Sequence, residues 1–185
     1  MELDFRALWA QALPYHEFVR DSGAHRKLWE GMQRIAKVPE WAVDAAQSSG
    51  KRFNLLVIAE DWCGDGSSTI PYLAKLAGVT RNIEIRILRR DEYPAVMDRY
   101  LTNGGRAIPI VIVLDSDFDE IGAWGPRPAA LQEWVLRARA KTGMKPPFPQ
   151  IRRWYARDRG ESMLREVLGL LSVAPRAPEQ ELVPV

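Results

Sequence analysis

The sequence predicts an α/β protein with a mixed central sheet, flanking helices and helical extensions at both ends. Three observations lead to this fold class. Residues 53–59 form an apolar run, residues 67–78 follow with helical periodicity, and residues 83–88 alternate isoleucine with charged side chains. A buried strand, a helix and a second strand in this order make a right-handed crossover between parallel strands. A further apolar run at 110–114 supplies another strand.

The N-terminal extension, residues 1–50, is expected to form helices and no strand. Apolar side chains recur at helical spacing in three short stretches, which Pro14 and Pro39 separate. Pro39 suits the first turn of the third stretch, because its missing N–H leaves no helical hydrogen bond unmade there. The Ser-Ser-Gly sequence at 48–50 then ends this extension as a linker, and we expect its helices to pack on the sheet.

The first two predicted strands differ in their expected burial. Residues 53–59 are apolar except for Asn54, which is typical of a central strand buried on both faces. In the next strand Ile83, Ile85 and Ile87 alternate with charged residues, which indicates one buried face or a place near the sheet edge. We expect the two strands to lie side by side and parallel, with residues 53–59 in the centre.

Residues 93–124 add a helix and an antiparallel hairpin. The helix is predicted over 93–101, and an Asn-Gly-Gly turn ends it. The strand at 110–114 then turns through Asp-Ser-Asp into a partner strand at 120–124. The sheet is therefore expected to be mixed, with parallel and antiparallel neighbours.

The C-terminal part is expected to be helical up to a proline-rich tail. A helix with one apolar face runs from the prolines at 126 and 128 to Gly143, where the predicted core, residues 51–143, ends. Residues 144–185 comprise a stiff proline-containing linker, a C-terminal helical segment and a flexible tail from Pro175. Because the apolar spacing changes phase across Gly160, one bent helix and two short helices both fit the segment.

Composition and charge narrow the class of protein. A chain of 185 residues, 46% hydrophobic and 27% charged, is typical of one folded domain with extensions. A formal net charge of +2 does not indicate nucleic-acid binding, and no apolar run reaches the roughly 20 residues that cross a bilayer. The acidic first residues do not match a signal peptide, and one cysteine forms no internal disulfide. These features predict a cytoplasmic protein.

The single cysteine, Cys63, lies where the central strand passes into the following helix. Free backbone N–H groups and the positive end of the helix dipole at such a junction favour a thiolate. Glu60, Asp61 and Asp65 act in the opposite direction, because nearby negative charge raises the pKa of a thiol. We expect Cys63 to be partly exposed, with a lowered pKa, and reactive. An inert, partly buried cysteine is the alternative.

The loop around this cysteine resembles that of a known family, the thioredoxins. Residues 61–66, Asp-Trp-Cys-Gly-Asp-Gly, match the first half of the family's Trp-Cys-x-x-Cys loop between a strand and a helix. Pro71 follows Gly66 by the five residues that separate the family's second cysteine from a helix proline. The Arg-Ala-Ile-Pro sequence at 106–109, before an apolar strand, resembles the family's cis-proline loop. The resemblance spans roughly residues 51–143 and implies a thioredoxin-like fold.

The resemblance also implies a site formed by the cysteine loop and the proline loop. Its residues are Cys63 as the nucleophile, with Trp62, Gly64, Asp65, Gly66, Arg106, Ile108 and Pro109 as binding residues. In the family the proline is cis, its loop lies beside the cysteine, and the loop backbone pairs with an extended partner chain. On this basis Arg106 is expected to offset part of the acidic charge around the thiol. Trp62 is either a platform beside the thiol or a core side chain, and Asp65 is expected to interact with free N–H groups at the helix start.

Two positions depart from the family's pattern and leave two functional hypotheses. Gly66 stands where the family has a second cysteine, which resolves mixed disulfides, and Val57 stands where the family has a buried acid. The first hypothesis is a monothiol oxidoreductase that forms mixed disulfides at Cys63 with protein or low-molecular-weight thiols and disulfides. The second is a non-catalytic module that binds an extended peptide beside Pro109.

No sequence pattern predicts a cofactor or a metal site. The two histidines and one cysteine lack the ligand spacing of known metal centres, and no glycine-rich phosphate-binding loop is present. The sequence therefore predicts partners that are proteins or small thiols rather than nucleic acids or membranes. It specifies no oligomeric state.

Overall fold

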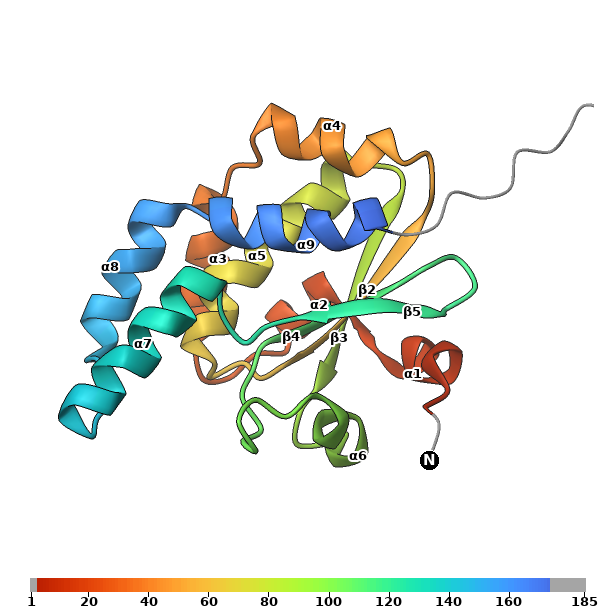
Figure 1. Ribbon diagram of the computed structural model, residues 1–185. Coiled ribbons are helices and arrows are strands. Elements are labelled where there is room, and N and C mark those ends of the chain that lie inside the picture. The colour runs from red at the N-terminus through yellow and green to blue at the C-terminus, as the bar shows by residue number, and fades with distance from the viewer. Residues whose placement is uncertain (1–2, 174–185) are drawn as a thin grey trace, which may run out of the picture.

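The computed structural model describes residues 3–173, which form a five-stranded mixed sheet with helices on both faces (Figure 1). The strands are β1 (Leu13–Pro14), β2 (Phe53–Ala59), β3 (Ile83–Arg89), β4 (Ile110–Leu114) and β5 (Glu120–Trp124), in the spatial order β1-β3-β2-β4-β5. β2 lies in the centre, parallel to β3 and antiparallel to β4, as the sequence predicted. β4 and β5 form the expected antiparallel hairpin.

Two helical layers bury the two faces of this sheet. The N-terminal helices are α1 (Phe5–Gln11), α2 (Tyr15–Arg20), α3 (Arg26–Ile35) and α4 (Glu40–Ser48); later in the chain come α5 (Gly64–Val79), α6 (Pro94–Met97), α7 (Ala129–Thr142), α8 (Phe148–Asp158) and α9 (Glu161–Val173). Side chains of α2–α5 and α9 pack with Leu55 and Val57 on one face, while those of α1 and α6 pack with Leu56 and Ile58 on the other. Because successive strand residues point to opposite faces, the apolar side chains of β2 contribute to both cores.

The expectation of no N-terminal strand was wrong. Leu13 and Pro14 form β1, which pairs antiparallel with Ile87 and Arg86 at the edge of the sheet. Two residues are too few to produce a recognisable alternation, and a proline is tolerated at an edge because its missing N–H removes no ladder hydrogen bond there. No sequence pattern therefore indicates this strand.

The helix predicted over residues 93–101 is shorter than expected. α6 ends at Met97, and one 3₁₀ turn, Asp98–Tyr100, follows it. Asn103 and Gly104 then adopt positive φ angles of 50° and 76°, which make the turn into the proline loop. This turn is exposed and leads through the proline loop into β4.

The C-terminal segment forms two helices, so the alternative of two short helices is the correct one. Between α8 and α9, Arg159 and Gly160 have positive φ angles of 54° and 81°. A Cβ atom on Gly160 would lie 2.6 Å from the ring of Tyr72, so only glycine fits this close approach. α9 then runs back across the sheet beside α4 (Figure 1). The flexible tail predicted from Pro175 lies outside the described residues.

Helices α7 and α8 form an antiparallel pair at one side of the molecule, here called the α7–α8 hairpin (residues 129–159; Figure 1). Its small core consists of Leu131, Val135, Ile151 and Tyr155, with Trp154 packed against it. α7 ends at Thr142 and is capped by Gly143, which has a φ of 73°, as the glycine in the sequence predicted. The hairpin therefore has its own apolar cluster, separate from those on the two faces of the sheet.

Candidate functional site

Cys63 caps the N-terminus of α5 and lies against the proline loop. The backbone N–H of Gly66 donates a hydrogen bond to the Cys63 Sγ at 3.2 Å, so the sulfur replaces the usual oxygen of a helix cap. The thiol donates to the backbone oxygen of Ile108 at 3.4 Å. The Ile108–Pro109 peptide bond is cis. The cysteine loop and the proline loop, 45 residues apart in the chain, thus meet at the sulfur atom.

The expected exposure and lowered pKa of Cys63 were both wrong. The side chain is only 5% exposed and belongs to the core cluster on the α1–α6 face of the sheet. Burial raises the pKa of the thiol to about 11, and the hydrogen bond from the Gly66 N–H offsets only part of this effect. At neutral pH the group is a protonated thiol, which agrees with its role as a hydrogen-bond donor to Ile108.

The α7–α8 hairpin contacts the cysteine loop through Phe148. A Cβ atom on Gly64 would lie 2.2 Å from Phe148 Cζ, so the ring rests directly on the glycine that follows the cysteine. Phe148 is nevertheless 45% exposed, and the guanidinium of Arg152 lies 5.9 Å from its ring centroid. An aromatic ring from the C-terminal extension therefore forms part of the surface of the cysteine loop.

Asp65 has a different role from the one expected. Instead of bonding to helix N–H groups, its carboxylate accepts hydrogen bonds from Arg127 and, at 2.9 Å, from the Tyr155 hydroxyl. The Asp65 and Arg127 side chains are 12% and 14% exposed, so the ion pair is largely shielded from water. One carboxylate thus connects the start of α5 with α8 and with the segment before α7.

We expect Asp65→Asn to lower the free energy of unfolding by about 2 kcal/mol, because the mutation leaves a poorly solvated arginine without its countercharge. Urea unfolding of the full chain measures this. Asp44→Asn on α4 is the control, since Asp44 is exposed and makes no ion pair within residues 3–173. Equal stability of the two variants would show that the Asp65 pair contributes nothing.

The acids before the cysteine hold the loop to the rest of the chain. The carboxylate of Asp61 accepts from the backbone N–H groups of Gly23 and Ala24 at 2.7 and 3.1 Å. The indole N–H of Trp29, which is fully buried, donates to the Asp61 carbonyl at 2.8 Å. Glu60 is also buried, and its carboxylate accepts from the Asp91 N–H. These groups fix the loop in place rather than act on the sulfur.

Trp62 points away from the core and Arg106 points away from the thiol. Trp62 is 43% exposed, and the guanidinium of Arg90 lies 4.8 Å from its ring centroid, so it is not a core side chain. Arg106 makes a two-pronged ion pair with Asp98, at 2.7 and 2.8 Å. The expectation that Arg106 offsets the acidic charge at the thiol was therefore wrong; Arg127 is the arginine whose charge opposes part of the rise in the pKa of Cys63.

A family model described as thioredoxin matches residues 12–143, and these residues include the cysteine loop, the proline loop and all five strands. The chain belongs to the thioredoxin family. The family resemblance read from residues 61–66 and 106–109 is thereby confirmed. A comparison with curated protein sequences gave no match.

Two solved structures resemble this member of the thioredoxin family. One is a protein of unknown function, PA1234, from Pseudomonas aeruginosa, with 22% identity and a TM-score of 0.76. The other is a crystallised HIV epitope scaffold with 21% identity and the same TM-score of 0.76. Each alignment covers 94% of this chain and 100% of the other chain. At this level of identity the likeness supports the fold alone.

This thioredoxin-family protein lacks the groups that accompany a dithiol site. Gly66 stands in the position of the second cysteine, and the fully buried Val57, rather than an acid, stands in the position of the buried carboxylate. Among residues 3–173 no three His, Cys, Asp or Glu side chains gather as metal ligands. No helix in this part of the chain is long and apolar enough to span a membrane.

Sequence reasoning missed three residues of the site: Arg127, Phe148 and Tyr155. Phe148 and Tyr155 lie beyond the match to the thioredoxin family, which ends at residue 143. Arg127 lies inside the match but between two prolines, where no periodicity indicates its direction. Only a contact across the fold identifies any of the three.

Proposed function

We propose that this protein is a thioredoxin-fold binding module that holds an extended segment of a partner protein at the cysteine loop and the proline loop. The observation that carries the proposal is the state of Cys63, a buried, protonated thiol that donates to the Ile108 carbonyl. A nucleophilic cysteine requires a thiolate that a partner sulfur can reach. The closed arrangement instead suits a loop with a structural cysteine.

Exposed aromatic rings beside the cysteine support a binding role. Trp62 directly precedes Cys63 in the loop, and the Phe148 ring rests on Gly64; both rings are exposed. The guanidinium of Arg90 lies over the Trp62 ring, and that of Arg152 lies over the Phe148 ring. Tryptophan, other aromatic residues and arginine are enriched among the residues that dominate binding energy at protein interfaces.

The proposal can be tested by selecting peptides from a random library displayed on phage against the immobilised full chain. We expect selected peptides to bind Cys63→Ser as tightly as the original chain and to lose at least tenfold in affinity on Trp62→Ala. Val79→Ala is the control, because Val79 is exposed at the end of α5 opposite the cysteine loop. Peptides that all contain cysteine and depend on Cys63 would instead favour redox chemistry.

A monothiol oxidoreductase is the second candidate, and one observation favours it. The Cys63 Sγ already accepts a hydrogen bond at the N-terminus of a 16-residue helix, where a thiolate is stabilised once water reaches it. In that case the Cys63 thiolate attacks a disulfide, forms a mixed disulfide and releases the other sulfur as a thiolate. A second, external thiol such as glutathione then attacks the mixed disulfide and regenerates Cys63.

Gly66→Cys provides a direct check of the loop geometry on which this second candidate depends. A Cβ atom on Gly66 would lie 3.5 Å from both the Cβ and the Sγ of Cys63, at the short end of the Cβ–Cβ distances in disulfides. We expect the variant to oxidise to an internal disulfide, which mass spectrometry and thiol titration detect. The unmodified chain should not reduce insulin disulfides, and the reduced variant should do so weakly, because Val57 provides no proton acceptor. A variant that keeps two free thiols under oxidising conditions would contradict the geometry.

A further inference from the structure

The α7–α8 hairpin concentrates positive charge that the rest of the chain lacks. Residues 129–159 contain eight lysines and arginines but only two acids, Glu133 and Asp158, a net charge of +6 in a chain whose total is +2. The remaining residues therefore carry a net charge of −4. A formal charge near zero for the whole sequence conceals a strongly basic part and an acidic remainder.

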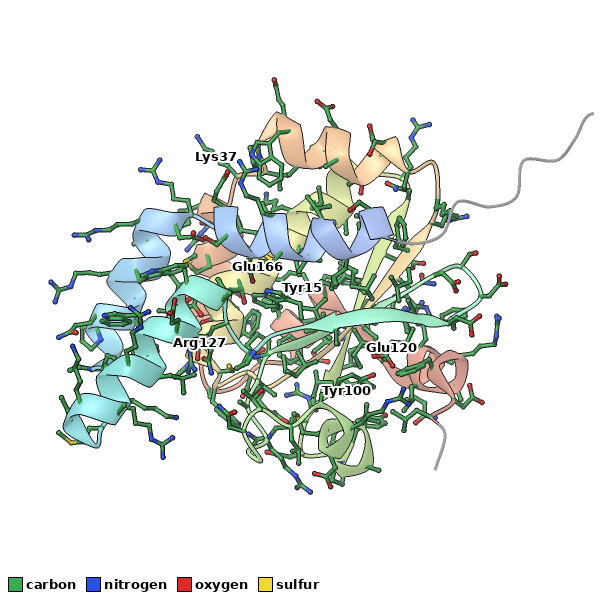
Figure 2. The ribbon with its side chains drawn as sticks, in the orientation of Figure 1. Tyr15, Lys37, Tyr100, Glu120, Arg127 and Glu166 are labelled. Carbon is green, nitrogen blue, oxygen red and sulfur yellow. The ribbon has the colours of Figure 1, made fainter. Side chains whose placement is uncertain are left out.

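These basic side chains are exposed and largely unpaired. The eight are Arg137, Arg139, Lys141, Lys145, Arg152, Arg153, Arg157 and Arg159, and each of them is exposed. Within residues 3–173 only Arg137 makes an ion pair, with Glu133 on the same helix. Figure 2 shows nitrogen-tipped side chains that extend from α7 and α8 into solvent. Fold stability does not explain seven cations held near one another without counterions.

The same surface also exposes apolar side chains and reaches the proposed binding site. Trp134, Leu136 and Met144 are exposed on α7 and just after it. Phe148 opens α8 and rests on Gly64, so the charged surface is continuous with the cysteine loop. A ligand that occupies the loop near Trp62 and extends past Phe148 therefore meets the basic hairpin.

We propose that the α7–α8 hairpin binds an acidic stretch of the partner protein whose extended segment occupies the cysteine loop. This inference rests on the proposed function and names the chemistry of the partner, a segment rich in carboxylates with interspersed apolar residues. Arginine guanidinium groups bind carboxylates through paired hydrogen bonds, and exposed aromatic rings accept the apolar side chains. A long nucleic acid fits less well, because it would extend beyond the hairpin and meet the remainder of the chain, with its net charge of −4.

The experiment measures fluorescence anisotropy of a labelled synthetic peptide of alternating glutamate, serine and leucine, and of the same peptide with glutamine in place of glutamate. We expect the full chain to bind the glutamate peptide at least tenfold more tightly in low salt and to lose most of that preference in high salt. The triple variant Arg139→Glu, Arg153→Glu, Arg157→Glu should lose at least tenfold in affinity for the glutamate peptide.

A second triple charge reversal, placed outside the hairpin, shows whether a loss of binding comes from the hairpin surface or from the change in net charge. Lys27, Arg34 and Lys37 are exposed on or after α3 and make no ion pair within residues 3–173, so Lys27→Glu, Arg34→Glu, Lys37→Glu changes the net charge equally. This control should bind nearly as well as the original chain. Equal losses in the two triple variants would overturn the proposal, and so would tighter binding of a single-stranded oligonucleotide of the same charge. Circular dichroism shows that each variant is folded.

Trp62→Ala distinguishes failure of this inference from failure of the proposed function. If the triple charge reversal on the hairpin abolishes peptide binding and Trp62→Ala does not, the basic surface is supported and the proposed binding role of the cysteine loop is wrong. If Trp62→Ala abolishes binding and the hairpin reversal does not, the loop has its proposed role and the inference about the hairpin is overturned.

Discussion

Native Cys63 should react with iodoacetamide at pH 8 about 100-fold more slowly than the same cysteine in the unfolded chain. A thiol with a pKa of about 11 is about one-thousandth ionised at that pH, whereas an ordinary cysteine is about one-tenth ionised. Because the thiolate is the reactive form, the rate should rise about tenfold for each pH unit up to the pKa. Burial of the sulfur slows the reaction further. Mass spectrometry of samples quenched over time measures the rate.

Two variants identify the cause of this protection. Phe148→Ala removes the ring that rests on Gly64 and should speed alkylation, since reagent then reaches the loop from the side of the hairpin. Trp134→Ala removes an exposed ring elsewhere on the hairpin and should leave the rate unchanged. If the native chain is alkylated as fast as the unfolded chain, the thiol is accessible and the binding-module proposal fails in favour of mixed-disulfide chemistry.

Gly125→Ala should destabilise the protein by about 4 kcal/mol or more, enough to leave much of the chain unfolded. Gly125 has a φ of 135°, a conformation that residues with a side chain rarely adopt. A Cβ atom there would lie 2.2 Å from the carbonyl oxygen of Pro109 and 3.2 Å from the Cα of Ile110. These neighbours are backbone atoms of the proline loop and β4, so relief of the clash requires movement of the sheet or of the site itself.

Gly78→Ala is the matched control for this substitution. Gly78 lies inside α5, and no atom would lie within 4 Å of an added Cβ, so alanine should stabilise the helix by up to about 1 kcal/mol. Urea unfolding of both variants gives the two changes in free energy. A Gly125→Ala protein as stable as the original chain would mean that the proline loop is free to move, and that the contact between Cys63 and Ile108 is not held in place.

Much of the fold follows from local sequence patterns. The mostly apolar β2, the alternating isoleucines of β3 and the helical periodicity between them predict the central crossover, because burial selects these patterns directly. Gly143 likewise marks the end of α7, since a positive φ favours glycine. The meeting of Cys63 with the residue before Pro109 followed from a resemblance that extends over two loops.

Tertiary structure alone decided the chemical state of the site. The position of Cys63 at a helix start predicts a lowered pKa, but its burial against Ile108 outweighs the hydrogen bond from Gly66. The length of α6, the two-residue strand β1 and the direction of Arg106 depend on packing rather than on periodicity.

The same holds for the contacts that the α7–α8 hairpin makes with the cysteine loop. The sequence by itself determined the charges of the hairpin, the place of the single cysteine in the chain and the absence of a second one. It did not determine that Phe148 and Tyr155, 85 and 92 residues after Cys63, would contact its neighbours Gly64 and Asp65. Solvation and charge at a thiol depend on whatever atoms the whole fold brings within a few ångströms, and no local pattern in the chain contains that information.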